Sequence, residues 1–210
     1  MKTAIAAAVG LALLTSQARA EDDESPPMFQ AALHGGYRFG GSLEDAETGD
    51  ARDLDESSSF ALSLELRYGR GDDRFYQLWY SRQSTNVSDG VSKFDTDVEY
   101  LHIGGTLPFG GWEHAQPYFA AGLGVTRFSA SDPSADDRVK FSGSMAFGLE
   151  VPLSKKAALR FEGRGYLTFT DTDTSFFCKS DNGEGVCRIV ATGASIFQAE
   201  MLAGILVRFW

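Results

Sequence analysis

Residues 197–210 read FQAEMLAGILVRFW. The residues at every second position form an apolar row: Phe197, Ala199, Met201, Ala203, Ile205, Val207 and Phe209. The positions between them include Gln198, Glu200, Gly204 and Arg208. A repeat of two residues predicts a β-strand with one apolar face. We therefore expect the chain to end on such a strand.

The other end of the chain has the features of an export signal. Lys2 precedes an apolar run at residues 4–14, and Ala18, Arg19 and Ala20 form a small-residue cleavage site. We expect residues 1–20 to be a signal peptide, residues 21–27 a periplasmic leader and residues 28–210 one folded domain. No later segment has an apolar run of about 18 residues, so any membrane insertion must use strands.

The formal net charge of the 210 residues is −10 at pH 7, which argues against nucleic acid as a partner. The apolar content of 43% is ordinary for a soluble protein. It is also what a membrane barrel has when apolar and polar residues alternate along each strand.

Seven earlier segments also have the strand pattern, at residues 28–40, 59–69, 74–84, 96–107, 116–128, 139–151 and 157–170. The segment at 96–107 has poor phase, because Val98 and Tyr100 favour one face while Leu101 and Ile103 favour the other. A β-bulge would explain this change of phase. Together with the closing stretch, the pattern predicts eight strands.

The connections alternate in length, with long polar loops expected at residues 41–58, 85–93, 129–138 and 171–194 and short turns between them. With eight strands, every long loop lies at one end of a barrel and every short turn at the other, as in outer-membrane barrels. Aromatic residues cluster near both ends, as expected for two girdles: Phe39, Phe60, Tyr80, Phe141, Phe169 and Phe197 near the loops, and Phe29, Tyr68, Phe119 and Phe209 near the turns.

The closing strand and the runs at 69–85, 100–106, 117–128 and 163–177 resemble small bacterial outer-membrane β-barrels, described as porin-like, OmpA-like or OmpW-like. The resemblance implies an all-β, eight-stranded antiparallel up-and-down transmembrane barrel in the bacterial outer membrane. It implies contact with outer-membrane lipid and lipopolysaccharide, a monomer, and assembly by the barrel assembly machinery through the C-terminal strand. Trp210 departs from the pattern, since the apolar row ends on Phe209.

Alternation alone also describes a soluble exported barrel of the lipocalin type, whose apolar row faces an internal ligand. The export signal, the closing strand, the loop asymmetry and the terminal aromatic residues favour the membrane barrel. In that case the polar row faces a narrow interior, where charges must pair as a plug. The predicted interior charge network consists of Arg38, Glu65, Arg67, Glu99, Glu150, Arg160, Glu162, Arg164, Glu200 and Arg208.

Catalysis and metal binding have weak support. His34, His102 and His114 are the only histidines, and none is followed by serine or spaced as a metal site. His34 is expected to join the interior network. A catalytic triad assembled across strands stays open. The acidic loop at 44–56 lacks the spacing of a calcium loop. We expect no enzyme, cofactor or metal site.

Two functions remain: a structural or surface-interaction barrel that acts through its long external loops, and a narrow channel or transporter for small or apolar solutes. A lipid A modifying enzyme is a third, weaker alternative. Fold alone does not choose among them.

Cys178 and Cys187 are the only cysteines. An exported chain meets an oxidising compartment, and the eight intervening residues allow the chain to turn back. We expect a disulfide between them rather than a metal or redox pair.

Overall fold

The first and last long strands pair along their length and close a barrel. In this computed structural model, β1 (Phe29–Gly40) runs antiparallel to β12 (Ser195–Phe209), with Phe29 opposite Phe209. The structure describes residues 27–45, 51–69, 72–88, 93–112, 114–130, 137–169, 174–181, 184–191 and 195–209. The expected signal peptide, the leader up to residue 26 and Trp210 lie outside these residues.

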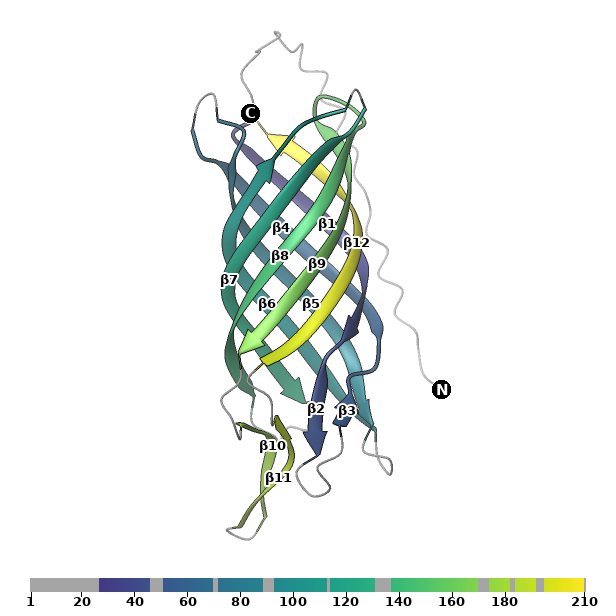
Figure 1. Cartoon of the computed structure of the whole chain (residues 1–210), viewed down its shortest axis with the longest axis vertical. Helices are drawn as coiled ribbons and strands as arrows, with labels where there is room; N and C mark the ends of the chain where they lie inside the picture. The colour runs from purple at the N-terminus through teal and green to yellow at the C-terminus, as the bar shows by residue number, and fades with distance from the viewer. Residues whose placement is uncertain are drawn as a thin grey trace, which may run out of the picture.

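Six further strands complete the barrel: β4 (Ser57–Arg67), β5 (Phe75–Ser88), β6 (Lys93–Pro108), β7 (Gln116–Ala130), β8 (Arg138–Pro152) and β9 (Ala157–Phe169). Their order around the barrel is β1-β12-β9-β8-β7-β6-β5-β4, and β4 pairs back to β1 (Figure 1). The prediction of an eight-stranded antiparallel barrel is confirmed. Closure leaves no unpaired barrel edge. The described residues contain no helix with the length and hydropathy that a membrane span requires.

The expected bulge at residues 96–107 is absent, because β6 pairs residue by residue with β5 and with β7. Val98 and Tyr100 face the interior, whereas Leu101 and Ile103 face outward. The poor phase therefore arises from apolar residues inside the barrel, not from a change of register. The loops expected at 85–93 and 129–138 are also shorter than predicted, since β5 to β8 extend into them.

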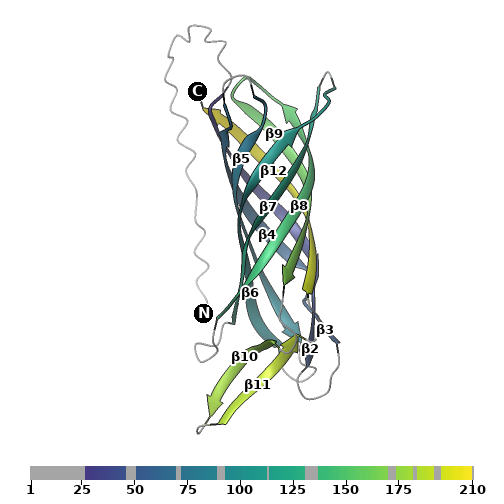
Figure 2. The same ribbon diagram turned by 60° about the vertical axis from the view of Figure 1, so that its left-hand side comes forward.

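Four short strands form a second sheet at the long-loop end: β2 (Ser42–Asp45), β3 (Ala51–Asp53), β10 (Thr174–Asp181) and β11 (Glu184–Ala191). Its order is β10-β11-β2-β3, and it projects beyond the barrel (Figures 1 and 2). Because β2 follows β1 and β11 precedes β12, the pairing of β11 with β2 continues the seam between β12 and β1. The loops at 41–58 and 171–194 were wrongly predicted to lack strands, since these strands are too short for a clear alternation.

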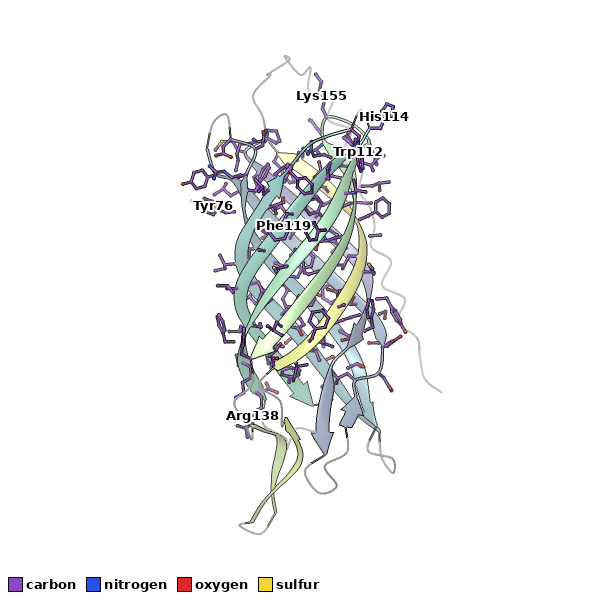
Figure 3. All side chains as sticks on the ribbon, in the orientation of Figure 1. Tyr76, Trp112, His114, Phe119, Arg138 and Lys155 are labelled. Carbon is purple, nitrogen blue, oxygen red and sulfur yellow. The ribbon has the colours of Figure 1, made fainter. Side chains whose placement is uncertain are left out.

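The two faces of the barrel differ in polarity. The outward face exposes large apolar side chains, with Ile103 72% and Phe147 66% exposed. Tyr76 points away from the wall (Figure 3). The inward face buries charged and amide side chains such as Arg38, Glu65 and Gln77. This is the reverse of a soluble barrel, so the structure decides against the lipocalin alternative.

Cross-strand aromatic pairs occupy the outward face near both ends. Phe29 and Phe209 lie 5.6 Å apart between ring centroids at the short-turn end, and Phe141 and Phe169 lie 5.8 Å apart at the long-loop end. Such pairs stabilise neighbouring strands. Aromatic residues at these levels are typical of the two interfaces of a membrane barrel.

Candidate functional site

The inward row of the barrel wall is the candidate site, because it brings together polar side chains from all eight barrel strands. Three groups of contacts follow one another along the barrel axis, and an apolar group covers them at the long-loop end.

Glu65 and Arg160 form the first group, nearest the short turns. Arg160 donates from Nη1 to Glu65 Oε1 at 2.7 Å and from Nη2 to Glu65 Oε2 at 2.9 Å. Its Nε also donates to Glu150 at 3.2 Å, and Arg208 pairs with the same carboxylate. Gln77 donates to Glu65 at 2.8 Å. Two parallel bonds between guanidinium and carboxylate are the strongest geometry for such a pair.

Arg164 and Glu162 form the second group, at the middle. Arg164 Nε donates to Glu162 Oε1 at 2.7 Å, and Tyr118 donates to the other carboxylate oxygen at 2.7 Å. The guanidinium carbon of Arg164 lies 3.8 Å from the ring centroid of Trp79. Arg164 Nη2 also donates to Gln77 at 3.2 Å. Because Gln77 bonds to Glu65 as well, the first two groups form one network.

Arg38 and Glu200 form the third group, nearer the long loops. Arg38 Nη2 lies 3.1 Å from Glu200 Oε1, and Tyr166 donates to the same carboxylate. Trp79 Nε1 donates to the Tyr166 hydroxyl at 3.0 Å, which links this group to Arg164. The rings of Tyr100 and Tyr166 stack at 4.0 Å, and Arg38 lies against both rings. In all three groups the buried arginine is thus paired with a buried glutamate.

An apolar group lies at the long-loop end. Leu54, which follows β3, packs inside with Val98, Phe128 and Ile196, and all four side chains are buried. The backbone N–H of Leu54 donates to the Gly41 carbonyl at 2.9 Å, which fixes the entry of this segment. This apolar group was not predicted, because Leu54 lies among acidic residues in a segment without periodicity.

Glycines on the inward face make room for large rings on the neighbouring strand. Gly148 lies opposite Tyr118, and a Cβ atom at Gly148 would lie 2.2 Å from Tyr118 Cζ. Gly204 lies opposite His34 in the same way, and a Cβ atom at Gly204 would lie 2.6 Å from the imidazole Cδ2. Gly in a strand often marks such a close approach.

The histidines do not form a catalytic arrangement within the described residues. His102 is 1% exposed, and its ring nitrogens bond to Ser144 at 2.9 Å and Ser142 at 2.8 Å, with no carboxylate among these partners. His34 is buried beside Trp79, and neither ring nitrogen has a hydrogen-bond partner in the described part of the chain. His114 is exposed among the short turns (Figure 3). No group of three His, Cys, Asp or Glu residues suited to a metal is found in the described part.

The structure places most of the ten predicted network residues on the inward row. Seven are buried there: Arg38, Glu65, Glu150, Arg160, Glu162, Arg164 and Glu200. Arg208 reaches Glu150 from the short-turn end. Arg67 also belongs to the inward row, but it bonds to the Pro27 carbonyl at 2.8 Å rather than to an interior carboxylate. Beside it in the same turn, hydrogen bonds from Arg74 lower the pKa of Asp72 to about 2.

Glu99 is the exception, because it lies on the outward face. Val98 and Tyr100 occupy the interior positions of β6, so Glu99 between them must point outward. There it accepts hydrogen bonds from Tyr80 at 2.7 Å and Arg127 at 3.2 Å. Its placement in the interior network was wrong.

Several members of the network escaped the sequence reasoning, notably Gln77, Trp79, Tyr118, Ser144 and Tyr166. They could have been recognised from their positions, since all five lie on the same face of their strands as the predicted charges. A search for charged residues alone passes over amides, hydroxyls and aromatic rings.

Most of the chain matches the model of one protein family. Residues 4–184 match the family model described as the outer membrane protein beta-barrel domain. No curated protein matches the chain.

Similar solved structures include the Neisserial surface protein A, with a TM-score of 0.61, 15% identity, and coverage of 86% of this chain and 97% of that one. The outer membrane protein OprG from Pseudomonas aeruginosa has a TM-score of 0.55 at 12% identity, with coverage of 89% and 98%. The outer membrane protein AlkL, in lipid bilayers, has a TM-score of 0.55 at 14% identity, with coverage of 90% and 94%. At these identities the likeness shows the shared fold.

Proposed function

The chain belongs to the family of the outer membrane protein beta-barrel domain, and from that premise we propose that it is a closed, non-conducting barrel that acts through its long-loop end. Its location is the bacterial outer membrane. The proposal concerns what the barrel does there.

The linked interior network is the observation that carries the proposal. Side chains of β1, β4, β5, β9 and β12 meet across the lumen, as in the contacts of Arg160 with Glu65 and of Trp79 with Tyr166. An eight-stranded barrel has an interior only wide enough for side chains. Opening a path would require breaking charge-assisted hydrogen bonds between buried side chains, which are stronger than hydrogen bonds between neutral groups. The buried Leu54 group adds an apolar cover to the network at the long-loop end.

A closed barrel leaves the segments at the long-loop end to carry the function. The sheet β10-β11-β2-β3 extends the chain beyond the barrel at the long-loop end. Loops positioned by a rigid scaffold are the usual place of binding residues. We therefore assign surface interaction to this end and treat the barrel as its support.

Catalysis on lipid A has less support. His102, the one histidine in contact with serine among the described residues, is buried and lacks a carboxylate partner, so nothing orients it as a general base. An unchanged lipid A mass profile in cells with and without the protein is the expected result.

Planar-bilayer conductance tests the proposal. The refolded protein should give no unitary conductance steps, because the network fills the lumen. A variant with Trp79→Ala and Tyr166→Ala removes two interior rings and should show steps, which demonstrates that the assay detects an opened lumen. Frequent steps from the unmodified protein, similar to those of the variant, would favour the channel alternative and overturn the proposal.

We further expect a monomer, and we expect the assembly machinery to read β12, the strand that closes the barrel. Native mass spectrometry of the protein released from detergent micelles tests the first of these. A dominant dimer would contradict it.

A further inference from the structure

The strands β1 and β12 are the one neighbouring pair in the described barrel that no loop or turn joins directly. Every other neighbouring pair follows one barrel strand with the next along the chain, as β4 with β5 or β8 with β9. Such a connection restricts how two strands can slide past each other, because turn type and loop length fix the register of a hairpin. The register of β1 against β12 must therefore come from contacts between the two strands themselves.

The outward face of this closing pair does not choose one register. A shift of one residue would turn the inward row outward, but a shift of two residues keeps every side chain on its own face. Outward residues are apolar on both strands, with Leu33 opposite Ile205 and Tyr37 opposite Met201. A shift of two would only exchange one apolar contact for another.

The inward face of the closing pair is complementary in size. At three successive levels a large side chain of one strand lies opposite a small residue of the other, and the large member alternates between the strands. These three pairs are Ala32 with Leu206, His34 with Gly204, and Gly36 with Leu202. The fit leaves no spare room, since a Cβ atom at Gly36 would lie 2.9 Å from Leu202 Cδ2.

The next inward pair is complementary in charge. Arg38 lies opposite Glu200, and its Nη2 is 3.1 Å from Glu200 Oε1. Both side chains are fully buried. At the end of the pair, Gln198 donates to the Gly40 carbonyl at 3.2 Å. Four inward levels of the closing pair are therefore matched either in size or in charge.

A shift of two residues in either direction would break these matches. In one direction His34 would face Leu202, and in the other it would face Leu206. Arg38 would face Gln198 or Leu202, and in both cases it would lose the carboxylate directly opposite it. Overpacking a buried site and leaving a buried charge without its partner are both costly. The inward face therefore favours the observed register over its neighbours.

We propose that these inward pairs select the strand that closes the barrel, so that β1 accepts β12 in this register alone. The residues that determine the selection on β1 are His34 and Arg38. Their required counterparts on the closing strand are a small residue, Gly204, and a carboxylate four positions before it, Glu200. The inference goes beyond the proposed function, since it concerns how the barrel closes and not what it binds.

Cysteine cross-linking of the refolded protein measures the register. With both native cysteines replaced by serine, Gly35→Cys and Ala203→Cys place two thiols directly opposite each other on the outward face. A Cβ at Gly35 meets nothing within 4 Å. Two further proteins combine Gly35→Cys with Met201→Cys or with Ile205→Cys and report shifts of two residues. We expect mild oxidation to link the first pair preferentially, because diagonal neighbours lie about 7–8 Å apart.

The size match is tested by Ala32→Leu, which sets two large side chains against each other at the level of Leu206. A shift of two would bring position 32 opposite Gly204 and relieve the overlap. At the urea midpoint of the unmodified protein, the Gly35–Met201 link should therefore rise relative to the Gly35–Ala203 link, by on the order of tenfold. Adding Leu206→Ala should restore the original ratio, because a small residue again faces a large one.

The charge match is tested independently by Arg38→Glu, which sets two buried carboxylates opposite each other. The same shift of two would place position 38 opposite Gln198, so the Gly35–Met201 link should again gain on the order of tenfold over the native link. Exchanging the charges, with Arg38→Glu and Glu200→Arg together, should restore the ratio of the unmodified protein.

Gly148→Ala is the matched control. It overpacks the interior against Tyr118, on strands away from the closing pair. It should destabilise the barrel without changing the ratio of shifted to native links. This control separates a change of register from a general loss of stability.

Three results would overturn the proposal: an unchanged ratio of links in both Ala32→Leu and Arg38→Glu, no recovery in either exchanged pair, or an equal change of the ratio in Gly148→Ala. Links of similar yield at the native and shifted positions of the unmodified protein would also overturn it. None of these results depends on conductance, so the selection of the closing strand and the non-conducting role fail separately.

Discussion

Arg160 is the residue on which the interior depends most directly, since it bonds to two carboxylates from different strands. Arg160→Leu should destabilise the barrel by roughly 3 to 5 kcal/mol, because Glu65 is left buried without its cation. Urea unfolding in lipid vesicles measures the change.

A double variant sharpens this prediction. Glu65→Leu combined with Arg160→Leu should cost less than the sum of the single changes, because no unpaired charge remains at that pair. Arg74→Leu serves as a surface control and should leave the urea midpoint nearly unchanged, because an exposed ion pair contributes little to stability. An unchanged urea midpoint in Arg160→Leu would mean that the inward row is hydrated.

A substitution at Gly148 tests how tightly the barrel interior is packed, because it adds a single methyl group. Gly148→Ala should destabilise the barrel by about 1 to 3 kcal/mol, because the new methyl group overlaps the Tyr118 ring and disturbs its bond to Glu162. Gly35→Ala is the matched control, since a Cβ there meets nothing within 4 Å. Equal unfolding midpoints for the two variants would contradict the arrangement.

At the scale of the element, β6 was correctly predicted as a strand, but Glu99 was assigned to the wrong face of it. Its period of two is intact, but Val98 and Tyr100 belong to the buried interior group with Trp79 and Tyr166. Apolar residues therefore occupy both faces, and charge no longer indicates the inside. The neighbouring strands show that Glu99 faces outward, because it lies opposite Arg82 on β5 and opposite Arg127 on β7.

The β10 and β11 hairpin is the element in which we expect the disulfide. Its register places Cys178 opposite Cys187, a cross-strand position compatible with a bridge. Closing a ring of about 10 residues should remove roughly 2.7 kcal/mol of loop entropy from the unfolded chain. Reduction should leave the barrel's gel shift intact and increase protease cleavage between residues 177 and 189.

Thiol labelling of the unreduced, denatured protein checks the bridge. We expect no labelling before reduction and two labelled cysteines after it. A Cys178→Ser, Cys187→Ser variant, which should resemble the reduced protein under protease, is the control. Two reactive thiols before reduction would refute the bridge.

At the scale of the whole molecule, closure should make the barrel resistant to detergent. Unheated and boiled samples should migrate differently in detergent gels, and circular dichroism should be dominated by strand signal, because every barrel strand pairs on both sides. Identical migration with a helical spectrum would contradict the architecture.

The alternation in the sequence predicted the eight barrel strands, their antiparallel order and the grouping of seven of the charges on one face of the wall, because alternation is a local property of each strand. Only the tertiary structure decided that the polar row is inside, that Glu99 faces outward, and that β2, β3, β10 and β11 form a sheet. It also decided which charges pair: Arg38 meets Glu200, a residue 162 positions away. Such pairs depend on the register and tilt of strands around a closed barrel, and periodicity within one strand carries no information about either.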